Sequence, residues 1–139
     1  HDLLMTCNAR GRAVPTILFT LTLCGSPKTL EFMEWLGIHI PDDIKEELRL
    51  STNAVARSVE IASAIAKDLI GFCIERDIPF GFNIESVATR KEEVDASIGL
   101  LNTIASMLKA HGLRKDGACV GDSSVAVTVD GAARALIRP

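Results

Sequence analysis

The chain lacks a strong excess of either charge. Its 139 residues include 15 lysines and arginines and 18 aspartates and glutamates, which gives a net charge of −3. The two signs are interspersed, whereas proteins that bind nucleic acid or anionic membranes carry a basic stretch or face. We therefore expect no nucleic-acid partner and no membrane partner.

Long apolar runs are also absent. The longest uncharged segment, residues 13–27, contains Pro15, Gly25 and three threonines, whereas a membrane-spanning helix needs about 20 mostly apolar residues. This segment is better interpreted as a buried strand. No charged-then-apolar signal stretch follows His1, so we expect a cytoplasmic protein.

No Cys-x-x-Cys pair occurs among the four cysteines, which are Cys7, Cys24, Cys73 and Cys119. Their wide spacing argues against a disulfide framework and against a zinc site, so we expect reduced thiols and no bound metal. Only Cys24 lies where chemistry could take place, directly after a predicted strand. We expect it to act as a small buried hydrophobic side chain.

What the chain does contain is two similar strand-to-helix turns. Residues 16–23 are apolar on both faces, which is typical of a parallel strand covered on both sides. Ser26 followed by Pro27 then favours a helix start, because serine caps free amides and proline fits the first helical position. A second apolar run, residues 80–87, leads into another helix near Arg90. We interpret the chain as two consecutive strand-helix units.

Two such units are too few to complete a parallel α/β protein. They can neither close a barrel nor bury both faces of a parallel sheet, so we expect residues 1–112 to be part of a larger α/β enzyme. From Leu113 onward glycine, alanine, serine and aspartate become common. We predict that residues 113–139 form a tail of uncertain order, with a short strand at 125–129 and a helical turn or two at 132–137.

Two long amphipathic helices should cover the strands. The helix after Ser51 has an apolar side made of Val55, Val59, Ala62, Ala66, Leu69, Ile70 and Cys73. The second helix runs to about Ala110, and its predicted core face is Val94, Ile98, Leu101, Ala105 and Leu108. Two acidic pairs are interpreted as solvated helix faces: Glu46/Glu47 and Glu92/Glu93.

The candidate site follows from the rule that ligands gather at the carboxyl ends of parallel strands. After the first strand, the helix start at Ser26 with Lys28 beside it could hold an anion. The interpretation that we favour is that Ser26 only caps the helix and Lys28 is solvated. Phe32 and Trp35 follow on the same helix, where they are expected to pack, although an aromatic ring there could flank a planar ligand.

After the second strand, Asn83 and Glu85 are the main candidates. They are two residues apart, so their side chains share one strand face. If that face points into a barrel, the pair could hold a polar heterocycle or move a proton. The alternative is that Glu85 pairs with a neighbouring arginine or lysine as a structural ion pair, and the sequence leaves both interpretations open.

Two stretches resemble a known family. Residues 20–38, TLTLCGSPKTLEFMEWLGI, with Ile40-Pro41, are similar to the late part of methylenetetrahydrofolate reductases. Residues 81–87, GFNIESV, with RKEE at 90–93, extend the resemblance, which covers about residues 2–108. It is stronger to a divergent bacterial branch of the family than to its best-studied branch.

The resemblance implies a fold and an activity. The fold would be α/β, a partial (β/α)8 TIM-type barrel that supplies about the last two strand-helix units and is rich in helix. The family reduces 5,10-methylenetetrahydrofolate to 5-methyltetrahydrofolate with NAD(P)H, usually through FAD. Its catalytic acid and most flavin-binding residues belong to earlier strands, so this chain would contain no catalytic residue and would be inactive alone.

The resemblance also implies site residues. Phe32 corresponds to a phenylalanine that contacts folate, and Lys28 stands where the best-studied branch has a glutamine. Asn83 corresponds to an asparagine at the end of the last strand, and the arginine that follows it in the family falls on Ile84, so Arg90 would substitute for it. Two further folate contacts are assigned to Ser26 and Glu85.

Two other functions stay open. One is a non-enzymatic helical interaction or dimerisation module, in which the two long helices pack as a hairpin. The other is a barrel enzyme of different chemistry, because a fold alone does not determine a reaction. Besides a small-molecule substrate, the expected partner of the chain is another copy of itself or the missing amino-terminal part of the barrel.

Overall fold

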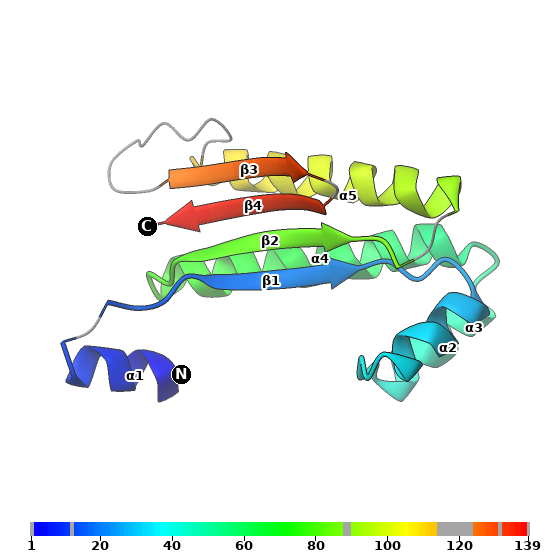
Figure 1. The fold of residues 1–139 in the computed structure, drawn as a ribbon, viewed down its shortest axis with the longest axis horizontal. Coiled ribbons are helices and arrows are strands. Elements are labelled where there is room, and N and C mark those ends of the chain that lie inside the picture. The colour runs from blue at the N-terminus through cyan, green and yellow to red at the C-terminus, as the bar shows by residue number, and fades with distance from the viewer. Residues whose placement is uncertain (1, 12, 88–89, 114–123, 131, 139) are drawn as a thin grey trace.

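The computed structural model describes residues 2–11, 13–87, 90–113, 124–130 and 132–138 (Figure 1). The elements in chain order are α1 (Asp2–Ala9), β1 (Ile17–Thr22), α2 (Pro27–Trp35), α3 (Asp42–Leu50), α4 (Ala54–Glu75), β2 (Phe80–Glu85), α5 (Lys91–Ala110), β3 (Ser124–Asp130) and β4 (Ala132–Arg138). Both predicted strands and both long helices are therefore present.

A four-stranded sheet in the order β1-β2-β4-β3 organises the fold. β1 and β2 are parallel neighbours, with Thr20 opposite Asn83 and Thr22 opposite Glu85. The prediction that the two strands lie side by side is confirmed. β4 runs antiparallel to both β2 and β3, so only one pair of strands in this sheet is parallel.

The carboxyl-terminal segment differs in part from its prediction. The strand predicted at 125–129 is present as β3, but the helical turn predicted at 132–137 is wrong, because these residues form β4. β4 pairs with β2 on one side and with β3 on the other. Backbone pairing along both edges outweighs the helix propensity of its alanines, which is a weak local preference.

The main core lies between one face of the sheet and the helices α4 and α5, which lie behind the sheet in Figure 1. Alternate residues of the strands supply this face: Leu21, Leu23, Phe80, Phe82 and Ile84. The helices supply Ala62, Ala66, Ile70, Cys73, Leu100, Ile104 and Leu108. On α4 the predicted apolar side is confirmed, with Val59 and Leu69 partly buried at its margin.

On α5 the predicted core face is confirmed only in part. Leu108 is buried and Leu101 packs against the core, whereas Val94 and Ile98 are exposed. The buried face consists of Glu93, Ser97, Leu100, Ile104 and Leu108. The helix carries apolar residues on more than one stripe, so hydrophobic periodicity alone could not choose between them. The buried stripe is the one that places Glu93 against the end of β1, as described below.

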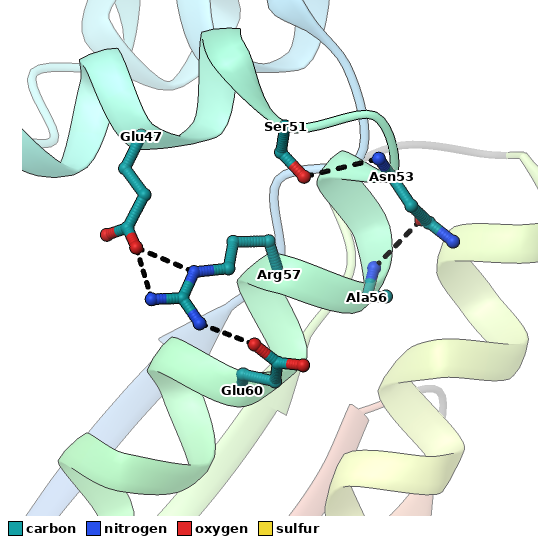
Figure 2. Close-up of polar contacts among 6 residues, drawn as sticks. All are labelled: Glu47, Ser51, Asn53, Ala56, Arg57 and Glu60. Atoms are coloured by element: carbon teal, nitrogen blue, oxygen red, sulfur yellow. Dashed lines mark hydrogen bonds and ion pairs between the residues drawn. The ribbon is translucent and has the colours of Figure 1, made fainter.

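α2 and α3 lie beyond the carboxyl end of β1 (Figure 1) and form a second small core with Cys24, Leu30, Met33, Ile40 and Leu48. Figure 2 shows how α3 is joined to α4: Arg57 binds Glu47 of α3 and Glu60 of its own helix. Asn53 caps α4 by accepting a hydrogen bond from the Ala56 amide at 3.0 Å. The ion pairs of Arg57 are exposed and contribute little stability.

The corrected face of α5 can be tested with two matched substitutions. Ile104→Ala removes a fully buried side chain and should lower the free energy of unfolding by about 2–4 kcal/mol. Ile98→Ala removes a side chain that is 55% exposed and should change it by less than about 0.5 kcal/mol. Urea unfolding followed by circular dichroism measures both, and equal losses would contradict this packing.

Candidate functional site

The carboxyl ends of β1 and β2 bring polar side chains together. Thr20 and Thr22 on β1 lie opposite Asn83 and Glu85 on β2. These four alternate with the core residues along each strand, so they occupy the sheet face that α4 and α5 do not cover. In a parallel barrel this face would point inward.

Asn83 and Glu85 interact directly, as their shared strand face predicts. The Asn83 Nδ2 donates a hydrogen bond to Glu85 Oε1. Glu85 thus has an amide partner, and the alternative of an ion pair with an arginine or lysine stays a prediction. Asn83 is only 4% exposed, and no described residue donates to its buried Oδ1. Such an acceptor is costly to bury unless a partner reaches it.

The start of α2 is built from hydroxyl groups. Ser26 is the N-cap, and its Oγ accepts a hydrogen bond from the Thr29 amide at 3.2 Å and lies 2.9 Å from Thr29 Oγ1. Pro27 occupies the first helical position, so the predicted capping role of Ser26 is confirmed. Ser58 of α4 holds Cys24, two residues before Ser26, because the Ser58 Oγ accepts a hydrogen bond from the Cys24 amide at 2.8 Å.

Glu93 is the functional candidate that sequence reasoning missed. It was expected on a solvated helix face, and that expectation is wrong: the residue is 1% exposed. Its Oε1 accepts a hydrogen bond from Thr29 Oγ1 at 3.3 Å, and no described group donates to its buried Oε2. An acidic residue in the first turn of a helix is usually solvated, so nothing in the local sequence marked this one.

Gly25 lies directly against Glu93. A Cβ atom added to Gly25 would lie 2.5 Å from Cγ, Cδ and Oε1 of Glu93, closer than atoms of this kind can approach. A side chain at position 25 would therefore force Glu93 to move, and Gly25 has no positive φ that would call for glycine. This close approach explains why a glycine stands three residues after the end of β1.

The position of Glu93 decides what the start of α2 can bind. Its carboxylate is in the first turn of α5 and contacts Thr29 in the first turn of α2. A negative charge is favourable at both places because helix amino termini carry partial positive charge. The chain's own anion thus lies where an external anion was considered beside Gly25 and Ser26. The Glu93 carboxylate would repel a phosphate group of a flavin or nicotinamide cofactor placed at this helix start.

The remaining candidates lie at the surface. Phe32 and Trp35 stack on each other, with ring centroids 5.7 Å apart and an interplanar angle of 16°; Trp35 is 78% exposed. Lys28 and Arg90 are exposed. Within the described ranges, neither cation forms a side-chain ion pair. The structure thus links Asn83 with Glu85, connects Ser26 to Glu93 only through Thr29, and leaves Phe32, Lys28 and Arg90 available to solvent.

A separate cavity of about 230 Å³ lies between the end of β1, the helices α2 and α3, and α4. Its walls include Cys24, Met33, Ile44, Leu48 and Ile61. None of the six predicted folate-contacting residues lines it. The walls are mainly apolar, so this cavity suits aliphatic side chains better than a polar heterocycle.

Two further features, a metal site and a membrane span, can be assessed for the described residues. No three histidine, cysteine, aspartate or glutamate side chains in those ranges gather in a way that could hold a metal ion. None of the helices in this part of the chain combines the length and apolar character of a membrane span.

Cys24 can be tested as a nucleophile. Burial, and to a smaller extent the charge of Glu93, raises the pKa of its thiol above the usual value, so little thiolate should form near neutral pH. Iodoacetamide at pH 8 should modify Cys24 in the native chain much more slowly than in the urea-unfolded chain. Peptide mapping by mass spectrometry measures the labelled fraction, and equally rapid labelling in both states would show a reactive thiolate.

Comparison with known proteins finds a likeness to a solved structure. No protein-family model and no curated protein matches the chain. Among solved structures, an uncharacterized protein from Clostridium thermocellum that binds two copies of 5-methyl-5,6,7,8-tetrahydrofolic acid is 44% identical, with a TM-score of 0.66. The match covers 71% of this chain and 35% of that protein. The chain therefore spans about a third of the length of a structural neighbour that binds a reduced folate.

Proposed function

We propose that this chain forms part of a binding site for a reduced folate, at the edge where β1 and β2 end. One observation carries the proposal: the Asn83–Glu85 pair, with its unsatisfied amide oxygen, lies on the sheet face opposite α4 and α5. The folate bound by the Clostridium thermocellum protein supports it independently, at 44% identity.

The pterin ring is the part of a folate that suits this pair. Its pyrimidine edge presents N–H and amino donors, and the protein offers acceptors in the Glu85 carboxylate and Asn83 Oδ1. Residues two apart on a strand are separated by about 6.6 Å along it, which places the two acceptors along one edge of a bicyclic ring. Because Asn83 is buried, the exposed Glu85 side chain would have to move aside to admit the ligand.

The rest of the folate would lie along α2. Phe32 is exposed and could stack on the aminobenzoyl ring. Lys28 is one helical turn earlier on the same helix and, like Arg90 at the start of α5, has no ion-pair partner among the described residues. These two cations would bind the carboxylates of the glutamate tail. Ser26 has its hydroxyl engaged in capping and would contribute at most a shared hydrogen bond.

The complete site would need more protein than this chain supplies. β1 is an edge strand, and no described strand pairs with its outer side. We propose that a partial (β/α)8 barrel continues from this edge, with β1 and β2 as its last two strands. In a closed barrel β2 would have a second parallel neighbour, so the β3–β4 hairpin would have to leave the position that β4 occupies here.

The activity that we propose for the complete protein is that of a methylenetetrahydrofolate reductase. It would reduce 5,10-methylenetetrahydrofolate to 5-methyltetrahydrofolate with NAD(P)H, and FAD would carry the hydride between them. The buried Glu93 makes the start of α2 unsuitable for the phosphates of either cofactor, so these would bind to the remainder of the barrel. The role of this chain is to hold the folate, and alone it should not catalyse.

Folate binding can be tested on the purified chain by titration calorimetry with 5-methyltetrahydrofolate. Asn83→Leu removes the free acceptor and should weaken binding about tenfold, which corresponds to one buried hydrogen bond. The same substitution removes an unsatisfied buried polar group, so the melting temperature without ligand should not fall. Asn102→Leu, at an exposed position on α5, is the matched control and should leave binding unchanged.

Two results would contradict the proposal. One is the absence of binding by the wild-type chain, and the other is equal affinity in the wild-type and Asn83→Leu chains. Either result would remove the role of the β2 edge in holding a folate.

The dimerisation module is the second candidate, and exposed apolar side chains favour it. Ile65, Phe72 and Ile74 on α4, with Val94 and Ile98 on α5, are each more than a third exposed. Surfaces of this kind often mark protein contacts. Sedimentation velocity separates the candidates: a dimer that Phe72→Glu dissociates, together with no folate binding, would support the module.

A further inference from the structure

Glu93 connects the two halves of the proposed site. Asn83 and Glu85 lie on β2, and Lys28 and Phe32 lie on α2, which follows a different strand. Glu93 joins the first turn of α5 to the first turn of α2 through the hydrogen bond from Thr29 Oγ1 and packs against the backbone of Gly25. This side chain therefore contributes to the spacing between the two halves, together with the pairing of β1 and β2.

The environment of Glu93 favours a fixed position for its carboxylate. The group is buried, it lies at the amino-terminal ends of two helices, and it accepts a hydrogen bond from Thr29 Oγ1 at 3.3 Å. Gly25 closes one side, with no room for a methyl group between its backbone and the carboxylate. A side chain held by packing and by a hydrogen bond can keep its neighbours within narrow limits.

The groups that Glu93 holds lead directly to the proposed ligand contacts. Thr29 is hydrogen-bonded to Ser26, the N-cap, so Glu93 and Ser26 together hold the first turn of α2 in place. Lys28 belongs to that turn, and Phe32 follows Thr29 by three residues, on the next turn. A shift of α2 would therefore move the cation and the aromatic ring together, away from the acceptors on β2.

We propose that Glu93 is a positioning residue for folate binding, which sets the distance between the α2 contacts and the β2 contacts without touching the ligand. This inference rests on the proposed function of the same site. Loss of Glu93 should therefore lower the affinity for ligands that span both halves and leave the affinity for ligands that contact β2 alone nearly unchanged.

Two probes separate these effects in titration calorimetry. 5-Methyltetrahydrofolate reaches both halves, whereas 6-methyltetrahydropterin lacks the aminobenzoylglutamate portion and should reach only Asn83 and Glu85. Glu93→Ala should lower the affinity for 5-methyltetrahydrofolate about tenfold or more. It should change the affinity for 6-methyltetrahydropterin by less than about twofold. Measurements are made at a temperature at which circular dichroism shows every variant to be folded.

Three further variants complete the design. Glu92→Ala removes the same charge from an exposed position in the same turn and should leave both affinities unchanged. Glu93→Gln keeps the length of the side chain and the oxygen that Thr29 contacts, and it should restore most of the affinity. Thr29→Val removes only the hydroxyl that binds Glu93; if Glu93→Ala fails to fold, this variant should show the same selective loss at smaller size, about threefold.

The contact with Gly25 gives a test that needs no ligand. Gly25→Ala should lower the melting temperature because its methyl group would overlap Glu93. In the Glu93→Ala background the same substitution should cost much less, since the space is then free. Equal shifts in both backgrounds would show that the two residues do not meet and would overturn the inference.

The outcomes are distinguishable. If the wild-type chain binds neither probe, the folate site itself is wrong and the positioning role falls with it. If the wild-type chain binds both probes and Glu93→Ala weakens them equally, the folate site stands, but Glu93 has only a general structural role. Selective loss of 5-methyltetrahydrofolate supports the positioning role.

Discussion

A single buried carboxylate at the junction of two helix starts is the constraint on which this structure depends. Glu93 takes a negative charge out of water, which is costly unless the surroundings compensate. Compensation comes from two helix amino termini and from the Thr29 hydroxyl, and it requires a glycine at position 25 so that the backbone can approach. Glu93 lies on the same face of α5 as Leu100, Ile104 and Leu108, which pack in the main core.

This constraint also limits the chemistry of the site. A helix start beside a glycine and a serine is the usual place for a phosphate in α/β proteins, and here the chain fills that place with its own acid. The ligand groups left to bind are therefore of another kind: hydrogen-bond donors for Asn83 and Glu85, an aromatic ring for Phe32, and carboxylates for Lys28 and Arg90. A reduced folate contains all three groups, whereas the phosphates of a nucleotide find no place at this helix start.

The elements of the fold were predictable where local signals were strong. Apolar runs bounded by proline and glycine located β1 and β2, the Ser26-Pro27 pair located the start of α2, and two-residue spacing placed Asn83 and Glu85 on one face. The core face of α5 and the burial of Glu93 were not predictable, because both depend on a contact between residues 64 positions apart. β4 was mistaken for a helix because its strand conformation comes from pairing with β2 and β3 and not from its own alanine-rich sequence. The resemblance to methylenetetrahydrofolate reductases indicated a folate from the sequence alone. A barrel built from this chain stays a prediction.

The stacked pair on α2 has a consequence for observing the molecule. Trp35 is the only tryptophan and the chain contains no tyrosine, so its ultraviolet emission comes almost entirely from one indole, which is mostly in contact with water. Because this indole lies at the end of the helix that Glu93 anchors, its emission maximum reports on that helix alone. Covering of the ring, by a small molecule or by another chain, would shift the spectrum to shorter wavelengths without any added label.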